Sequence, residues 1–159
     1  QFSRTSLIQD DRLVPRARPR IGQMIMFFYD PKGKKTLPVY DRFPLVIMVE
    51  PTKDGFYGLN LHYLPIRLRA VFFDELMDRL NNTRYDATTR FRLTYDLLNA
   101  SRKLRLFQPC FKKYLHNHVV SKVVEVPPEE WEISLFMPTD DFVGQNRQTV
   151  WQKSRTYQA

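Results

Sequence analysis

The chain has 159 residues, the size of one ordinary domain, and 43% of them are hydrophobic, so it can bury a core of its own. Its net charge of +8 comes from 25 Lys and Arg against 17 Asp and Glu, which favours polyanionic partners such as nucleic acid or an acidic protein surface. The single Cys110 excludes an intrachain disulfide and a cysteine-rich zinc site, and it fits a reducing compartment. No stretch approaches the roughly 20 apolar residues of a membrane span, so no membrane partner is expected.

Residues 1–21 are predicted to form an extended basic arm. The prolines of "VPRARPR" disfavour helix, and five arginines in the arm face only two acids. We expect such a segment to become ordered against a partner, although a solvated tail explains the same composition equally well. The candidate binding residues of the arm are Arg12, Arg16, Arg18 and Arg20.

Residues 22–138 are predicted to form a single domain that begins with three strands. The nearly continuous apolar run at 22–30 and the β-branched run at 45–50 both indicate buried strands. Between them lie a turn at "PKGK" and an irregular segment that contains two prolines. The third strand is "GFYGLNLHYLP" at 55–65, and the short connections favour an antiparallel meander.

The polar residues of this third strand invite two interpretations. Strict alternation would place Asn60 and His62 on one face, next to Gly58. A metal or catalytic site would need further ligands at suitable spacing, and none lies nearby in the sequence. We therefore predict a structural role, in which both side chains hydrogen-bond to the backbone of residues 37–44.

Helices are predicted after the third strand. Pro65 begins the first, whose apolar residues recur at helical spacing through "IRLRAVFFDELMDRLNN". A second helix is expected at about 87–102, and "FKKYLHNHVV" at 111–120 is predicted to be a short helix.

One more strand and a tail complete the chain. "SKVVEVP" at 121–127 is the fourth predicted strand, and Pro128 with two glutamates indicates the start of a further helix. Residues 139–159 are predicted to be a polar C-terminal tail. The expected fold class is α+β: a small antiparallel sheet of about four strands, helices inserted between its third and last strands, and the extended N-terminal arm.

No group of residues predicts catalysis. The glycines form neither a G-x-G-x-x-G nor a Walker pattern. His116 and His118 in "HNH" suggest a nuclease, but no second ligand cluster follows them at a suitable spacing. Cys110 is interpreted as a small buried residue. We expect no enzyme activity, no cofactor, and neither catalytic nor metal-binding residues.

The charge pattern is more informative. Residues 99–122 contain six basic residues and no acid, whereas 125–141 contain six acids and no base. Aromatic residues lie among the basic ones of 99–122, which we call the basic stripe. The stripe suits phosphate contacts with base stacking, and it suits equally a solvated charged face over aromatic core residues. The change of sign also suits head-to-tail protein assembly. The candidate binding residues of the stripe are Arg102, Lys103, Arg105, Lys112, Lys113 and Lys122.

Three runs carry a resemblance to a known family: "MFFYDPKGKKTLPVYDRFPLVIMVEP", "GFYGLNLHYLP" and "QPCFKKYLHNHVVSKVVEVPPEEWEISLFMP". Over roughly residues 22–138 the chain resembles small virion-associated proteins of T-even-type contractile-tailed bacteriophages. The first association within that family is the DNA end protector, and the alternative is a structural component of the neck, tail or baseplate.

The resemblance implies a non-enzymatic protein of the virion, present in the host cytoplasm during assembly. Its implied partners are the ends of double-stranded DNA or neighbouring virion proteins, with homo-oligomerisation in the particle left open. It assigns no catalytic residue. Binding is therefore expected at the arginine arm and the 102–122 stripe, and whether these surfaces contact DNA or protein stays open.

Overall fold

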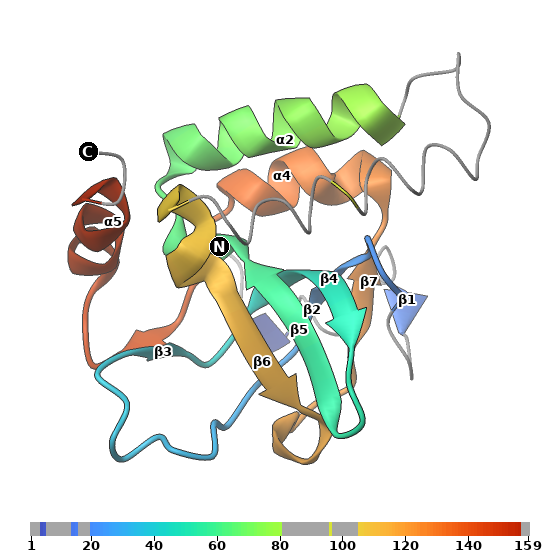
Figure 1. Cartoon of the computed structure of the whole chain (residues 1–159). Coiled ribbons are helices and arrows are strands. Elements are labelled where there is room, and N and C mark those ends of the chain that lie inside the picture. Colours follow the sequence, from blue (N-terminus) through green and yellow to red (C-terminus); the bar gives the residue numbers. More distant parts are fainter. Residues whose placement is uncertain (1–3, 6–13, 16–19, 81–95, 97–104, 157–159) are drawn as a thin grey trace.

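The computed structural model describes residues 4–5, 14–15, 20–80, 96 and 105–156, and every structural statement below concerns these residues (Figure 1). The strands are β1 (Val14–Pro15), β2 (Met24–Met26), β3 (Tyr40–Asp41), β4 (Leu45–Pro51), β5 (Gly55–Asn60), β6 (Phe111–Leu115), β7 (Val124–Val126) and β8 (Phe142–Val143). The α-helices are α2 (Ile66–Leu80), α4 (Trp131–Phe136) and α5 (Arg147–Thr156). The short 3₁₀ helices are η1 (Leu61–Tyr63), η2 (Arg105–Cys110), η3 (His116–His118) and η4 (Pro128–Glu130).

The main sheet has the strand order β1-β7-β2-β4-β5-β6, and all its neighbouring strands are antiparallel. β2, β4 and β5 form the predicted meander, and β7 is the predicted last strand, so the α+β class is confirmed. Two strands exceed the four expected: β1, which lies in the N-terminal arm, and β6, which pairs with β5. β3 and β8 form a separate short pair.

The sheet is buried on both faces, which explains the nearly continuous apolar runs of β2 and β4. Met24 and Met26 belong to the larger of two core clusters, whereas Ile25 between them belongs to the smaller. The larger cluster includes Phe72 of α2 and Trp131 of α4. These two helices pack against each other across one face of the sheet (Figure 1).

The smaller cluster, on the opposite face, is largely aromatic. Phe27 makes edge-to-face contacts with Tyr29, Phe56 and Tyr114 at ring-centroid distances of 5.2–6.0 Å. Close packing of β4 on β5 requires Gly58, because a Cβ atom there would lie 2.2 Å from Cγ1 of Val46.

Two predicted elements were wrong. Phe111–Leu115 is the strand β6 rather than helix, because Tyr114 inserts into the aromatic cluster and pairs with Phe56 of β5. The third strand ends at Asn60 rather than continuing through His62. There the Asn60 side chain accepts a hydrogen bond from the His62 backbone amide (3.0 Å) and caps η1.

The C-terminal segment from residue 139, predicted as a polar tail, carries β8 and α5. Val150 lies in the larger core cluster, and the Trp151 indole donates a hydrogen bond to the His62 carbonyl (2.9 Å). The predicted helix at 87–102 lies outside the described residues, apart from Asp96. Within the described ranges, no helix combines the length and apolar character that crossing a membrane requires.

Candidate nucleic-acid interface

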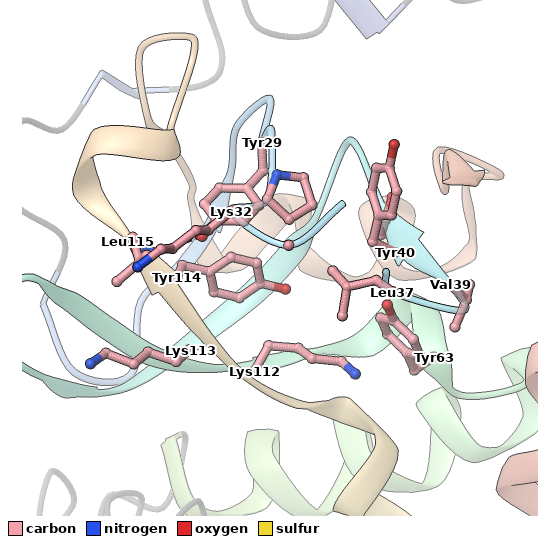
Figure 2. A pocket seen from close by; sticks show the side chains of 13 residues that line it. Tyr29, Lys32, Leu37, Val39, Tyr40, Tyr63, Lys112, Lys113, Tyr114 and Leu115 are labelled. Atoms are coloured by element: carbon pink, nitrogen blue, oxygen red, sulfur yellow. Dashed lines mark hydrogen bonds between the residues drawn. The ribbon is translucent and has the colours of Figure 1, made fainter. Parts of the chain in front are cut away.

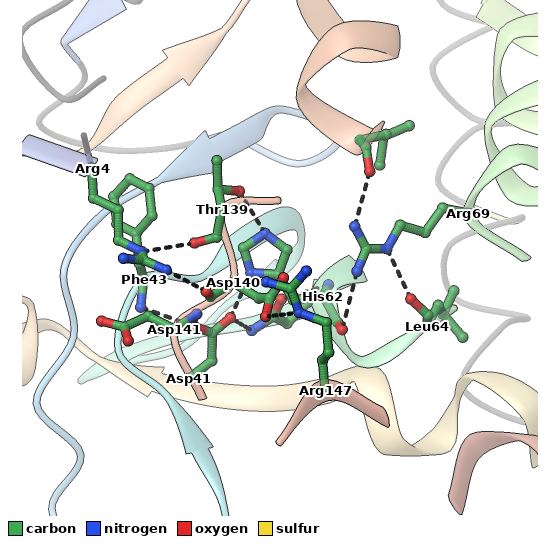
Figure 3. Close-up of polar contacts among 12 residues, drawn as sticks. Arg4, Asp41, Phe43, His62, Leu64, Arg69, Thr139, Asp140, Asp141 and Arg147 are labelled. Atoms are coloured by element: carbon green, nitrogen blue, oxygen red, sulfur yellow. Dashed lines mark hydrogen bonds and ion pairs between the residues drawn. The ribbon is translucent and has the colours of Figure 1, made fainter. Parts of the chain in front are cut away.

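Asp41 is the centre of a buried polar network that joins four segments of the chain (Figure 3). Its Oδ2 accepts hydrogen bonds from Nδ2 of Asn60 (3.1 Å) and Nδ1 of His62 (2.6 Å). Its Oδ1 accepts from the backbone amides of Phe43 and Asp141, both at 3.0 Å. Burial alone would raise the pKa of Asp41, but His62 and these donors outweigh it and hold the pKa below its usual range.

His62 connects this carboxylate to the C-terminal segment. Because a carboxylate only accepts, Nδ1 of His62 is the donor to Asp41, and Nε2 on the other side of the ring forms a hydrogen bond with the Thr139 hydroxyl (2.9 Å). We call Asp41, Asn60, His62 and Thr139 the Asp41 network. The prediction that Asn60 and His62 contact residues 37–44 names the correct segment, but their partner there is the Asp41 side chain rather than the backbone.

The order carboxylate, imidazole, hydroxyl resembles a hydrolase triad, but these three side chains are buried and serve to hold segments of the chain together. Asp41 is 4% exposed, His62 0% and Thr139 1%, so a substrate carbonyl has no approach to the Thr139 hydroxyl. The geometry instead fixes β3, η1 and the start of the C-terminal segment to one another. Among the described residues, no group of three or more His, Cys, Asp and Glu side chains could hold a metal ion.

Arg69 of α2 is a second buried polar group with satisfied hydrogen bonds. It is 1% exposed and donates to the backbone carbonyls of His62, Leu64 and Leu135 at 2.8–3.3 Å. Burial lowers its pKa to about 10, which still leaves the guanidinium charged at neutral pH. Arg69 thereby ties α2 to η1 and α4.

A pocket of about 320 Å³ lies beside this buried centre, between the connection from β2 to β3 and the edge strand β6 (Figure 2). We call it the lysine pocket. Its inner residues Asp41, Tyr63 and Tyr114 are buried, whereas Lys32 and Leu37 at its mouth are exposed. Its lining residues are Tyr29, Pro31, Lys32, Gly33, Leu37, Val39, Tyr40, Asp41, Tyr63, Lys112, Lys113, Tyr114 and Leu115.

Lys112 is the most enclosed cation of the lysine pocket. It reaches from β6 toward Tyr63, and its ammonium lies 4.3 Å from the centre of that ring (Figure 2). Burial lowers the pKa of Lys112. Within the described parts of the chain, no carboxylate lies at ion-pair distance from this ammonium.

The other lysines near the pocket are exposed. Lys113 leaves β6 in the opposite direction to Lys112 and pairs with Asp54 at 3.0 Å, which raises its pKa. Lys34 pairs with Asp30, and Lys32 and Lys35 flank it on the surface. The structure therefore brings Lys32, which lies in the predicted turn, to the same pocket as Lys112 and Lys113.

The predicted site residues are only partly brought together. Lys112 and Lys113 share the pocket, whereas exposed Lys122 precedes β7, which three strands separate from β6 in the sheet. Arg20 is exposed before β2, and Arg105 begins η2. The remaining candidates lie outside the described residues: Arg12, Arg16, Arg18, Arg102 and Lys103.

The aromatic residues of the basic stripe mostly belong to the core. Phe107 and Tyr114 are 9% and 4% exposed, and both lie in the hydrophobic clusters. Phe111 is partly buried against the larger cluster. These rings fit the alternative of aromatic core residues under a charged surface. Cys110 is fully buried, as expected.

Together these features define a class: a basic α+β protein in which three lysines line a pocket beside an edge strand. A family model described as the Phage T4 terminal DNA protecting protein matches residues 6–157. The match covers nearly the whole chain, so the chain belongs to this bacteriophage family, and the resemblance inferred from the sequence is confirmed. No curated protein and no solved structure matches the chain.

Proposed function

We propose that this protein binds the ends of linear double-stranded DNA in the phage particle and protects them without catalysing a reaction. The family description names protection of terminal DNA and no reaction. One structural observation supports a binding role most strongly: Lys32 and the pair Lys112 and Lys113, far apart in the sequence, line one pocket. Lysines of this kind neutralise phosphates without reading base sequence.

The local charge balance supports the same role. Around the pocket, Asp30 and Asp54 are each paired with a lysine, and the Asp41 carboxylate is satisfied by four hydrogen bonds. This leaves the positive charge of Lys32, Lys35 and Lys112 uncompensated among the described residues. An uncompensated positive surface attracts polyanions at long range.

The test compares linear duplex carrying 5′-phosphate ends with a closed circle of the same sequence, over a salt series. We expect tighter binding to the linear form and an affinity that falls steeply with salt, because bound phosphates release counterions. The combined change of Arg102, Arg105, Lys112 and Lys113 to Ala should weaken binding to all sequences alike. Equal binding to linear and circular DNA, or no salt-sensitive binding, contradicts the proposal.

A second candidate is assembly with neighbouring virion proteins, as a neck, tail or baseplate component. It is favoured by exposed apolar residues on the two adjacent helices: Val71 of α2 is 61% exposed and Ile133 of α4 is 55% exposed. In that case Val71→Ser with Ile133→Ser should reduce incorporation into particles without changing DNA binding. Removal of residues 1–20 should also abolish incorporation while circular dichroism shows a folded body. Normal incorporation of both variants excludes this candidate.

A further inference from the structure

The partly buried charge of Lys112 is the first indication that the pocket binds an anionic ligand. The ammonium of Lys112 is partly withdrawn from water, and the Tyr63 ring is its charge-stabilising contact among the described residues. A desolvated charge is costly unless an opposite charge approaches it. A ring face compensates only a part of that cost. Replacement of Lys112 by an apolar residue would remove the cost altogether, so its charge points to a ligand.

The shape of the lysine pocket restricts that ligand. A volume of about 320 Å³ is at the small end of ligand sites and suits one nucleotide-sized group. Asp41, Tyr63 and Tyr114 close the inner end because all three are buried. A blind pocket admits the end of a chain, whereas a strand that continues in both directions needs an open channel.

The walls of the lysine pocket offer contacts for both the phosphate and the base of a nucleotide. Lys112 offers a positive charge near the inner end. Pro31, Leu37 and Val39 supply apolar surface to the pocket, and partly exposed Tyr40 supplies an aromatic ring (Figure 2). Bases stack on aromatic rings and pack on apolar side chains whatever their sequence.

The nearby carboxylate does not oppose such a ligand strongly. Asp41 lines the pocket, but both its oxygens are occupied by the four donors of the buried network. Its charge is therefore compensated internally. The exposed Lys32 and Lys113 add positive potential at the mouth, although Lys113 shares its charge with Asp54.

We infer that the lysine pocket receives the terminal nucleotide of a DNA strand and holds its terminal phosphate through Lys112. A terminal phosphomonoester carries about −1.5 to −2 charges at pH 7, against −1 for each internal phosphate. The pocket thus distinguishes an end from the interior of the duplex by both charge and shape. This inference rests on the proposed function and specifies the chemical group that the protein recognises.

The experiment measures affinity for three linear duplexes of one sequence: with 5′-phosphate ends, with 3′-phosphate ends, and with hydroxyl groups only. We expect one phosphorylated form to bind on the order of tenfold more tightly than the hydroxyl form, because a charge-assisted contact is added. Deoxynucleoside monophosphates should compete for the protein, whereas deoxynucleosides and inorganic phosphate at equal concentration should compete weakly.

Variants assign the effect to the pocket. Lys112→Met keeps the apolar stem and should remove the preference for the phosphorylated end while retaining salt-dependent binding of duplex. Lys113→Met is the matched control on the adjacent residue, and it should weaken all three duplexes equally with their ratio intact. Circular dichroism verifies folding of both variants.

The outcomes separate this inference from the proposed function. If linear DNA is preferred over circular DNA but all three ends bind alike, the terminal-phosphate inference is wrong and end binding stands. If linear and circular DNA bind alike, end binding itself is wrong. If Lys112→Met is unfolded, the comparison of the three ends and the competition by nucleotides still decide the inference with the unaltered protein. A phosphate preference that survives in folded Lys112→Met places the recognition elsewhere.

Discussion

The Asp41 network and the lysine pocket meet at Asp41, which belongs to both. In the network, each carboxylate oxygen has two donors, and the His62 ring has a partner on both nitrogens. In the pocket, the Lys112 ammonium has a ring face but no carboxylate among the described residues. The two sets of neighbouring polar groups thus differ: the Asp41 network is fully hydrogen-bonded within the chain, whereas we propose that Lys112 receives its opposite charge from a ligand.

This difference separates stability from binding. Removal of one member of a fully hydrogen-bonded buried network leaves its partners unpaired, and this lowers the free energy of unfolding. Removal of a cation that lacks a partner relieves a desolvation cost instead. Residues of the Asp41 network should therefore affect stability, and Lys112 should affect binding alone.

The largest expected effect follows from Asp41→Asn. The substituted amide cannot accept from all four donors, so we expect the free energy of unfolding to fall by about 3 kcal/mol. Chemical denaturation measures it. The matched control is Asp141→Asn, which removes a surface ion pair with the 57% exposed Arg42 and should cost less than about 1 kcal/mol. Equal losses for the two variants would contradict a special role of the buried carboxylate.

His62→Ala should have the next largest effect, a loss of about 2 kcal/mol. The change opens a cavity and leaves Asp41 and Thr139 without their shared partner. DNA binding by the folded variant should be unchanged. His116→Ala, at an exposed histidine, should alter stability by no more than about 0.5 kcal/mol. A His62 variant of normal stability that had lost DNA binding would make His62 a binding residue.

Acid should weaken the same network. Because the pKa of Asp41 is lower in the folded state than in the unfolded state, the unfolded chain binds more protons between the two values, and stability rises with pH there. The contribution is complete above about pH 4, the ordinary range of an aspartate, and is lost as pH falls through the folded value. The stability difference between the unaltered protein and Asp41→Asn should therefore shrink on acidification below pH 4. A constant difference would exclude this origin.

The smallest expected change in stability is that of Lys112→Met. Loss of a partly desolvated charge should leave the free energy of unfolding within about 1 kcal/mol of the original or raise it slightly. Thermal unfolding measures this difference. A loss above about 2 kcal/mol would show that Lys112 stabilises the fold and would remove the contrast with the Asp41 network.

The sequence predicted those parts of the fold whose pattern is local. The apolar runs of β2 and β4 and the helical spacing of α2 follow directly from their residues. β6 was missed because five residues with two adjacent lysines carry no clear period, and its strand form depends on pairing with β5. The end of β5 was missed because the cap by Asn60 is a side-chain hydrogen bond that alternation does not reveal.

For the candidate site, the sequence predicted the basic residues but not the pocket that they line. Lys112 and Lys113 were identified from the basic stripe, but Lys32 was interpreted as a turn residue because its approach to β6 is a long-range contact. The partner of His62 was missed for the same reason. Asp41 has no period or motif around it, and only the folded chain places it between Asn60 and His62. A sequence signal for this partner did exist: an aspartate lies in an irregular segment next to a strand with polar residues, and such a carboxylate needs hydrogen-bond donors if it is buried.

The long separation within the Asp41 network has a consequence for biosynthesis. His62 and Thr139 are 77 positions apart, and the amide of Asp141 reaches Asp41 across 100 positions. While the ribosome extends the chain, Asp41 and His62 leave the exit tunnel long before these C-terminal partners exist. Until then their polar groups remain hydrated, and the centre of the molecule cannot close. Completion of this core therefore awaits the emergence of residues 139–141 from the tunnel, so the network forms late in the synthesis of this domain.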